Sequence, residues 1–277
     1  GDPGGGRGCR ERGGGTPLDE GDFQTGPLGV SVISAFHDRS RRAAHGGVIV
    51  HRPAAARPPV GIRRGPPGDA LLSRSVSRSV YLTAMGPASG KSVVALGLVE
   101  LLSRRAGRVG FFRPIVQSLP DNDLDLIRSR YELPDERVGT AFTVEELRRL
   151  GGDVDASERG MARAVREYKR IEALSDIVVV EGSDFAGASS PLEFALNAQF
   201  ARHLGSPVLA VVNGHDRSVS EIVERIRVSE QSLRARSHEI LGVIVNRVDT
   251  LSVDAVHEAL AERPSAAPPV WTIPEVG

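Results

Sequence analysis

The sequence predicts an α/β fold, a doubly wound and mostly parallel sheet over residues 79–277, preceded by a disordered N-terminal segment. Two observations lead to this prediction. From residue 79 onward, short β-rich runs alternate with amphipathic stretches, which is the pattern of βαβ units. Several runs are continuously apolar, as expected for strands that helices cover on both faces. No repeat of fixed period appears, so one domain accounts for the region.

Residues 1–78 differ from the rest in composition. They hold 16 of the 31 glycines and 8 of the 18 prolines, and 12 arginines outnumber seven acidic residues. Such a segment cannot bury enough apolar surface to offset the backbone entropy, roughly 1–2 kcal/mol per residue. We expect a disordered leader, or residues that are not part of the native protein. The alternative is a basic arm attracted to RNA or membranes.

Six strands and six helices are expected in alternation. The expected strands are Val80–Ala84, Val109–Phe112, Ile177–Glu181, Val208–Val212, Leu241–Asn246 and Val270–Ile273. The expected helices are Lys91–Arg105, Val144–Leu150, Glu158–Leu174, Leu192–Leu204, Val219–Arg236 and Val253–Glu262. Thr143 and Glu146 have the spacing of a capping box at the start of the second helix. Gly107, Gly151 and Gly205 follow helix ends, where a left-handed residue is favoured.

Composition excludes several classes of function. Basic and acidic residues are equal in number, 35 of each, so no overall charge indicates a nucleic-acid partner. The longest apolar runs are far shorter than the ~20 residues that span a bilayer. The single cysteine, Cys9, excludes an intrachain disulfide and a multi-cysteine metal cluster. With no secretion signal at its start, the chain is expected to be cytoplasmic, without a membrane partner.

The strongest chemical signal is the segment Thr83–Ser92, which reads TAMGPASGKS. It follows the first expected strand and opens the first expected helix, where backbone N–H groups and the helix dipole can hold phosphate oxygens. One lysine, Lys91, stands here in a chain with 33 arginines, and its compact ammonium fits among phosphate oxygens. The Ser92 hydroxyl would bind Mg²⁺. The expected nucleotide contacts are Thr83, Gly86, Ala88, Ser89, Gly90, Lys91 and Ser92.

The loop departs from the strict pattern G-x-x-x-x-G-K-[ST]. Met85 stands where the first glycine belongs, Gly86 comes one place late, and Pro87 has no N–H to offer. The alternative is an ordinary glycine-rich turn with a solvated Lys91. Because the strand, the Gly-Lys-Ser triplet and the long helix come in the required order, phosphate binding is favoured, with hydrolysis left open.

Acidic residues follow the strand expected at Ile177–Glu181. In phosphate-loop proteins an acid at such a strand end orients Mg²⁺ or its water, and ligands bind outside the carboxyl ends of parallel strands. Glu181 is the first candidate and Asp184 the second. The alternative is a solvated strand end.

Two further positions are weaker candidates. Asn246 and Asp249 follow another strand, and an amide with a carboxylate could read a purine base, which keeps GTP open beside ATP. A simple turn is the equal alternative.

Arg113 ends the second expected strand and could face an effector carboxylate or phosphate, or lie on the surface. No Ser–His–Asp or Cys–His set is present, so no catalytic residue is assigned.

With the loop, the Val180-Glu181-Gly182 strand end and Asn246 in view, residues 79–277 resemble the dethiobiotin-synthetase-like P-loop superfamily. Its loop is one residue longer than usual, which aligns Ala84 with the first glycine. Within the group, the chain is similar to the N-terminal domain of long-form bacterial phosphate acetyltransferase. The stretches that carry this likeness are 80–84, 90–98, 108–115, 197–199, 204–209, 212–214 and 269–275.

The resemblance implies a P-loop NTPase-like domain that binds ATP or GTP with Mg²⁺, or another small effector. It implies a regulatory and assembly role in a homo-oligomer of the full-length enzyme, which makes acetyl phosphate and CoA from acetyl-CoA and phosphate. That transfer belongs to a C-terminal domain expected beyond Gly277, so the chain is expected to be truncated.

Three alternatives remain. A stand-alone dethiobiotin synthetase, an ATP-dependent ligase, would carry Lys where Arg113 stands, and Glu-Gly-Ala-Gly-Gly where this chain has Glu181-Gly182-Ser183-Asp184-Phe185. A partitioning-type ATPase would carry a second lysine early in the loop, where Met85 stands. The third alternative is a structural module that binds nothing.

Overall fold

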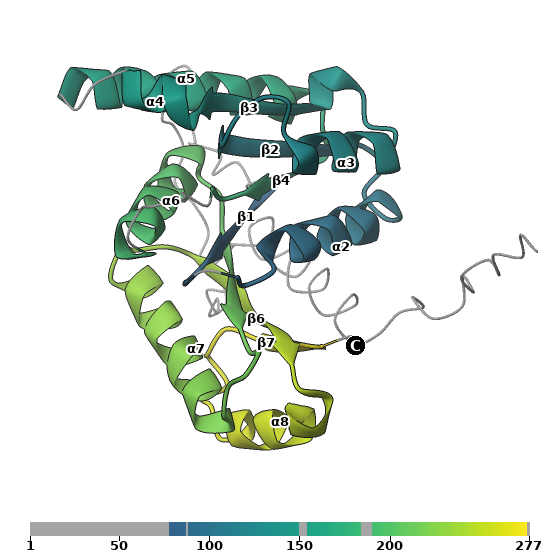
Figure 1. The fold of residues 1–277 in the computed structure, drawn as a ribbon, viewed down its shortest axis with the longest axis vertical. Coiled ribbons are helices and arrows are strands. Elements are labelled where there is room, and N and C mark those ends of the chain that lie inside the picture. The colour runs from purple at the N-terminus through teal and green to yellow at the C-terminus, as the bar shows by residue number, and fades with distance from the viewer. Residues whose placement is uncertain (1–77, 87, 150–153, 184–189, 276–277) are drawn as a thin grey trace, which may run out of the picture.

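A computed structural model describes residues 78–86, 88–149, 154–183 and 190–275, so the expected leader lies outside the described residues except for its last residue. One sheet organises the described part of the chain (Figure 1). Its strands are β1 (Ser79–Ala84), β2 (Val109–Val116), β3 (Val138–Thr143), β4 (Ile177–Glu181), β5 (Val208–Asn213), β6 (Ile240–Val248) and β7 (Val270–Pro274). Their order is β3-β2-β4-β1-β5-β6-β7, and every neighbouring pair is parallel. The α/β fold is confirmed, and the described sheet is wholly parallel.

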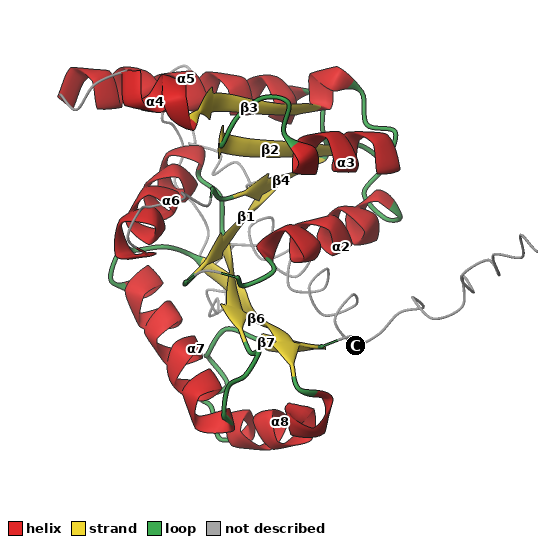
Figure 2. Ribbon diagram, in the orientation of Figure 1, coloured by secondary structure: helices red, strands yellow, loops and turns green. Residues whose placement is uncertain are grey.

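Helices cover both faces of the sheet (Figure 2). They are α2 (Lys91–Ser103), α3 (Asn122–Arg130), α4 (Val144–Arg149), α5 (Val154–Ala173), α6 (Ser190–Leu204), α7 (Val219–Arg234) and α8 (Val253–Ala261), with short 3-10 turns η1 (Asp135–Arg137) and η2 (Thr250–Ser252). Buried side chains of α2 and α3 pack on one face, and those of α5, α6 and α7 pack on the other. Within the described ranges, no helix is long and apolar enough to cross a membrane.

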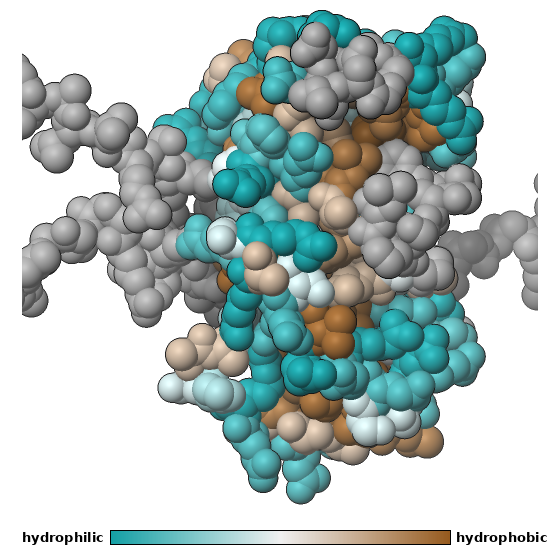
Figure 3. All heavy atoms as spheres, turned by 90° about the vertical axis from the view of Figure 1, so that its left-hand side faces the viewer, coloured by the Kyte–Doolittle hydropathy of each residue, from teal (hydrophilic) through white to brown (hydrophobic). Residues whose placement is uncertain are grey.

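The alternation of side chains along β1 shows why the sheet is covered on both faces. Val80, Leu82 and Ala84 pack with α2, whereas Tyr81 packs on the face that carries α5 and α6. All four are buried. Successive side chains of a strand point to opposite faces, so a continuous apolar run needs helices on both. On the side of α6 and α7, hydrophobic side chains gather in a strip between hydrophilic margins (Figure 3).

All six expected strands and all six expected helices are present, with shifted ends. One shift matters for the site: β2 continues to Val116, so Arg113 lies within the strand rather than at its end. The predicted capping box is confirmed: Thr143 N donates to Glu146 Oε2 (2.8 Å) and Glu146 N donates to Thr143 Oγ1 (3.2 Å). Gly107 and Gly205 are left-handed as expected, with φ of +73° and +65°. Gly151 lies outside the described residues.

The sequence prediction lacked one helix and one strand, α3 and β3. The nine residues of α3 read NDLDLIRSR, and only Leu124 and Ile127 are buried, so its apolar stripe is too short to give a period. β3 is an edge strand in which only Ala141 and Phe142 are buried. Both elements are stabilised by the tertiary packing rather than by a strong local pattern.

Because all described strands are parallel, their carboxyl ends lie at one edge of the sheet. The register places Glu181 beside Leu82 of β1, and Val180 beside Phe112 of β2, so Arg113 follows at the level of Glu181. This edge therefore collects the loop after β1 and the ends of β4 and β6, as in other open α/β sheets that bind ligands there.

A matched pair of leucine substitutions tests the core of the sheet. Leu209→Ala in β5 empties a wholly buried position and should lower the free energy of unfolding by about 2–5 kcal/mol, through lost burial and the cavity left behind. Leu251→Ala, at a position 92% exposed, should change it by less than about 0.5 kcal/mol. Urea denaturation measures both. Equal effects would contradict the placement of β5 in the centre of the sheet.

Candidate functional site

The loop between β1 and α2 has the curled backbone that phosphate binding requires. Gly86, Ala88 and Gly90 are all left-handed, with φ of +96°, +55° and +70°. For Ala88 this conformation costs roughly 1–2 kcal/mol, so the surrounding structure holds it in place. Gly90 caps the helix, and its carbonyl accepts from Val94 N (3.1 Å). The first N–H groups of α2, which have no partner inside the helix, therefore follow directly on the curl.

Asn246, at the end of β6, holds this loop against the sheet. Its Nδ2 donates to the carbonyl of Ser89 (2.9 Å), and both residues are buried. A Cβ atom at Gly90 would lie only 2.3 Å from the same Nδ2. Gly90 is therefore needed twice, for its left-handed backbone and for the space that Asn246 occupies.

Asp249, the second half of the expected Asn-x-x-Asp pattern, is exposed and lies in a turn. Its Oδ1 accepts from Leu251 N (3.1 Å) and caps η2. The structure therefore brings Asn246 to the phosphate loop and Asp249 to the turn that follows. Their contact with a purine base stays a prediction.

The two chemically important side chains of the Gly-Lys-Ser triplet point into the protein. Lys91 is only 2% exposed, which rules out the solvated lysine of the alternative interpretation. Ser92 Oγ lies 2.7 Å from Glu181 Oε1 and 3.0 Å from Asp123 Oδ2. Because a hydroxyl has one proton, it can donate to only one of these carboxylates at a time.

Glu181 is completely buried, so the alternative of a solvated strand end is wrong. Burial raises the pKa of this carboxyl, while the nearby positive charges of Arg113 and Lys91 act to lower it. Its Oε2 has no hydrogen-bond partner among the described residues, and neither has the buried Thr83 Oγ1 at the end of β1. Asp184, the second candidate acid, lies outside the described residues.

Arg113 is also buried, so the alternative of a surface arginine is wrong. Its Nη1 lies 2.6 Å from Asp121 Oδ1 and 3.0 Å from Asp123 Oδ2, and its Nε lies 3.6 Å from Glu181 Oε2. Burial acts to lower the pKa of the guanidinium, but Glu181, Asp121 and Asp123 together outweigh it, and the pKa is raised. Arg113 therefore stays charged inside a ring of carboxylates.

Sequence reasoning missed Asp121 and Asp123 because it did not find α3. Asp121 is the N-cap of that helix, and its Oδ1 accepts from Leu124 N (3.0 Å). An aspartate that precedes an acidic first turn is a helix-start signal, and it could have found both residues.

A third missed residue, Asn197 of α6, fixes the backbone beyond Glu181. Its Oδ1 accepts from Ser183 N and from the Tyr81 hydroxyl, both at 2.9 Å. The Ser183 hydroxyl donates to the carbonyl of Ile115 in β2 (2.6 Å). A Cβ at Gly182 would come within 2.6 Å of Asn197 Oδ1, so this position needs glycine. Ser183 thus joins β4 to β2 and is not free to contact a ligand.

The oxygens around Ser92 fit a magnesium ion only if a ligand supplies the rest. Among the described residues, no group of three or more His, Cys, Asp or Glu side chains could hold a metal. Ser92, Glu181 and Asp123 offer three oxygens, and the two distances from Ser92 Oγ, 2.7 and 3.0 Å, are close to the ~3 Å between adjacent ligands of an octahedral ion bound at 2.0–2.1 Å. Mg²⁺ commonly takes one or two carboxylates together with phosphate and water oxygens. The residues therefore fit Mg²⁺ beside a bound phosphate.

A hollow of about 640 Å³ lies at the carboxyl ends of the last strands, lined by Asp216, Arg217, Ser218, Asp249, Thr250 and Glu275. Glu275 accepts from Arg247 Nη2 (2.7 Å), and its Oε2 lies 2.6 Å from His215 Nδ1. Arg247 itself is left-handed, with φ +62°. Asn246, near the end of β6, contacts the phosphate loop, and Asp249, just past the end of β6, lines the hollow. The phosphate loop and the hollow therefore lie next to each other at the end of this strand.

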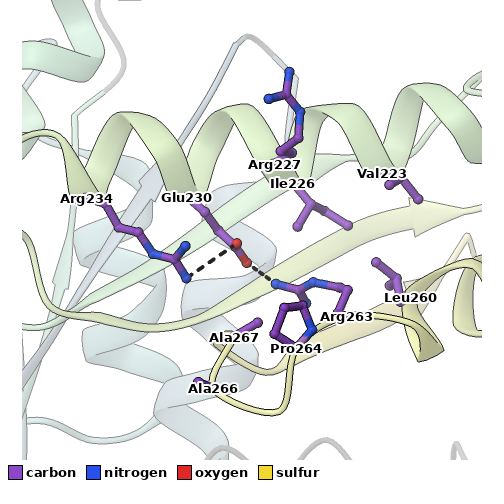
Figure 4. Close-up of a pocket in the computed structure, with 10 residues that line it drawn as sticks. All are labelled: Val223, Ile226, Arg227, Glu230, Arg234, Leu260, Arg263, Pro264, Ala266 and Ala267. Carbon is purple, nitrogen blue, oxygen red and sulfur yellow. Dashed lines mark hydrogen bonds and ion pairs between the residues drawn. The ribbon is translucent and has the colours of Figure 1, made fainter.

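A different groove, of about 600 Å³, runs between α7 and α8 (Figure 4). Glu230 is buried in it, is ion-paired with Arg263, and lies 3.8 Å from Arg234 (Figure 4). The groove is also lined by Pro264, Ala266 and Ala267, which lie in the segment leading to the amino end of β7, so it lies at the opposite edge of the sheet from the phosphate loop. It is not part of the candidate site.

Comparison with known proteins finds one matching family model and similar phosphate acetyltransferases. The model of a family described as an AAA domain matches residues 78–273. The phosphate acetyltransferase of Nitratidesulfovibrio vulgaris is 32% identical over 177 residues, which cover 62% of this chain and 25% of that enzyme. The phosphate acetyltransferase of Synechocystis sp. is 29% identical over 208 residues, 72% of this chain and 29% of the enzyme. The chain thus matches about a quarter of the length of these relatives.

Among solved structures, a GTPase in apo form from Pyrococcus abyssi is similar at a TM-score of 0.47 and 15% sequence identity, covering 68% of this chain and 75% of the GTPase. The fold itself follows from the strand order and the helices on both faces of the sheet.

The contact between Gly90 and Asn246 can be tested by a double-mutant cycle. Gly90→Ala should lower the free energy of unfolding by about 2–3 kcal/mol, because backbone strain and the clash add. In a protein that already carries Asn246→Ala, the same Gly90→Ala substitution should lower the free energy of unfolding by at least about 0.5 kcal/mol less, since the clash is gone. Gly205→Ala is the control: Gly205 has nearly the same φ as Gly90, and an added Cβ there would have no atom within 4 Å. This substitution should therefore show the cost of the backbone strain alone. Additive effects in urea denaturation would contradict the contact.

The raised pKa of Glu181 predicts a specific pH dependence of stability. The unfolded chain loses the Glu181 proton at a lower pH than the folded protein does, so over that interval the stability of wild type relative to Glu181→Gln should fall as pH rises. The slope should reach at most about 1.4 kcal/mol per pH unit. Urea denaturation from pH 4.5 to 7 measures this difference.

Glu221→Gln is the control for this experiment. The pKa of Glu221 is lowered by the hydrogen bond from the Ser218 backbone, so its titration lies below the same range. The difference between wild type and Glu221→Gln should therefore not fall with pH: it rises slightly near pH 4.5, where the unfolded chain titrates, and is flat above that. A difference between wild type and Glu181→Gln that is also flat, or that rises with pH, would show that Glu181 is ionised at the loop throughout.

Proposed function

The chain belongs to the AAA domain family, and from that premise we propose that it is the nucleotide-binding domain of a phosphate acetyltransferase. The observation that carries this proposal is the Gly90-Lys91-Ser92 triplet at the start of α2, with Lys91 buried and Ser92 held against Glu181. The alignment with two named phosphate acetyltransferases supports the kind of enzyme.

We place the phosphates of ATP or GTP at the mouth of α2. There the N–H groups from Ala88 to Ser92 donate to phosphate oxygens, and the helix dipole adds a positive potential. The Lys91 ammonium neutralises part of the phosphate charge. Thr83 and Gly86 complete the wall of the loop, and the buried Thr83 hydroxyl, which has no hydrogen-bond partner among the described residues, is a further donor.

In the proposed complex Mg²⁺, when bound, neutralises phosphate charge and orders the phosphate oxygens. Ser92, Glu181 and Asp123 would hold it, the last added by the structure to the expected set. Asp184 stays a candidate for a metal-bound water. We propose that the nucleoside lies over Asn246 toward the hollow lined by Asp249, with base identity, adenine or guanine, left to the polar groups there.

The chain's own part in the enzyme is proposed to be regulatory and structural. It matches about a quarter of the length of its relatives, so we place acetyl transfer in another part of the whole protein, a cytoplasmic homo-oligomer. The proposed dethiobiotin-synthetase-like relationship rests on the longer loop, in which Ala84 takes the place of the first glycine. Ligase activity is disfavoured because Arg113, which stands where such ligases carry Lys, is paired with three carboxylates.

The two lysines of the chain provide the direct test. Lys91→Ala should weaken binding of Mg-ATP, or of Mg-GTP if guanine is preferred, by about 10–100-fold, the effect of one lost charged hydrogen bond of ~1.5–3 kcal/mol. Lys169→Ala removes the same charge from the surface of α5, where Lys169 pairs with Glu172, and should leave affinity within about twofold. Isothermal titration calorimetry measures both.

The same titrations define the contrary results. If neither nucleotide binds the wild-type protein, the module is structural and the proposal is wrong. If both lysine variants bind as tightly as wild type, nucleotide is held elsewhere than at the loop. Circular dichroism on each variant excludes loss of fold as the cause of a weaker affinity.

A further inference from the structure

Two carboxylates at the mouth of α2 are shared between Ser92 and Arg113. Asp123 Oδ2 lies 3.0 Å from Ser92 Oγ and 3.0 Å from Arg113 Nη1. Glu181 faces Ser92 with Oε1 (2.7 Å) and Arg113 with Oε2 (3.6 Å). The carboxylates that fit a divalent cation beside Ser92 are therefore the ones that neutralise the guanidinium, and at Asp123 the same oxygen does both.

The contacts of Arg113 are unequal in strength. The shortest, 2.6 Å, joins it to Asp121, which also caps α3 and is thereby fixed in place. The contact with Glu181 is the longest, and both Arg113 Nε and Glu181 Oε2 are buried atoms without a hydrogen-bond partner among the described residues. Arg113 is thus anchored at Asp121 and attached more weakly to the other two carboxylates.

A divalent cation beside Ser92 would come close to this guanidinium in a buried, weakly screened environment. The ion and the guanidinium would compete for the same oxygen of Asp123, Oδ2, and would lie on opposite oxygens of Glu181. Repulsion between two cations this close in a buried site disfavours keeping both in place. The fixed contact with Asp121 allows Arg113 to turn aside without leaving the site.

We propose that Arg113 is the resident counter-cation of Asp123 and Glu181, and that a divalent cation enters beside Ser92 only in exchange for it. The guanidinium then stays paired with Asp121 and is released from the other two carboxylates. The proposal rests on the metal position assigned under the proposed function, but not on nucleotide binding. It makes Arg113 a positioning residue that sets the affinity of the site for metal.

Manganese binding tests the exchange without nucleotide. Mn²⁺ is titrated into the protein, and the free ion is counted by electron paramagnetic resonance. Arg113→Gln should bind Mn²⁺ at least about tenfold more tightly than wild type, because the competing cation is gone. Arg128→Gln removes the same charge from the exposed face of α3, where Arg128 pairs with Asp125 and Asp135, and should match wild type within about threefold.

Adding Asp123→Asn to Arg113→Gln should remove most of the gain in Mn²⁺ affinity. This loss would show that the ion is bound at Asp123. An Arg113→Gln protein that binds Mn²⁺ no more tightly than wild type would overturn the proposal. So would an equal gain in Arg128→Gln, since the effect would then be a general one of charge.

Loss of Arg113 could unfold the protein by leaving carboxylates buried without a partner. Arg113→Lys is the second variant for that case. Its single ammonium cannot replace both Nη1, which faces Asp121 and Asp123, and Nε, which faces Glu181, so Mn²⁺ should bind about threefold or more tightly than to wild type. Unchanged or weaker binding overturns the proposal.

Failure of this proposal and failure of the proposed function are separable. If wild type binds no ATP or GTP but Arg113→Gln gains Mn²⁺ affinity, the exchange stands and the nucleotide role does not. If wild type binds nucleotide and all Arg113 variants bind Mn²⁺ like wild type, the nucleotide role stands and the exchange does not.

Discussion

The burial of one carboxylate, Glu181, is the constraint around which the site is built. A charged carboxylate inside a protein is costly unless hydrogen bonds and opposite charges compensate it. Here the compensation comes from three directions: the Ser92 hydroxyl at the start of α2, the Arg113 guanidinium within β2, and the positive charge of Lys91. Ser92 and Lys91 belong to α2 and Arg113 belongs to β2, so the ion cluster joins this helix to the strands β2 and β4.

The sheet topology makes this cluster possible. The parallel register sets Glu181 of β4 beside both β1 and β2, so its side chain emerges between the phosphate loop and Arg113. On the other side of β1, Asn246 fastens the loop by its bond to the Ser89 carbonyl, and the lack of a side chain at Gly90 admits that contact. The loop is therefore held from both flanks before any ligand arrives. Such preorganisation lowers the entropy that a bound phosphate must offset.

How much of this the sequence could predict depends on how local each signal is. The apolar runs, the Gly-Lys-Ser triplet and the Thr143 capping box are local patterns, and the structure confirms the elements they predicted. α3 and β3 lack such patterns, because one is short and polar and the other lies at the sheet edge. Because α3 was not predicted, Asp121 and Asp123 were not recognised as site residues. Without them a surface position for Arg113 stayed open beside a contact with an effector, although its partners bury it.

Contacts between residues far apart in the sequence were the other part of the site that the sequence could not predict. Asn246 was considered for a purine base, and its bond to Ser89, 157 positions away, follows only from the packing of β6 beside the loop. The clamp of Asn197 on Ser183 likewise joins α6 to the end of β4. One sequence identifies the residue types but not which strand ends meet.

The most direct test of the central claim is a crystal structure of the protein grown with a non-hydrolysable ATP analogue and Mn²⁺. The account predicts triphosphate oxygens on the N–H groups from Ala88 to Ser92, and an anomalous Mn²⁺ peak within coordination distance of Ser92, Asp123 and Glu181. Arg113 should remain on Asp121. A loop without phosphate, with the nucleotide bound at another place on the molecule, would contradict it.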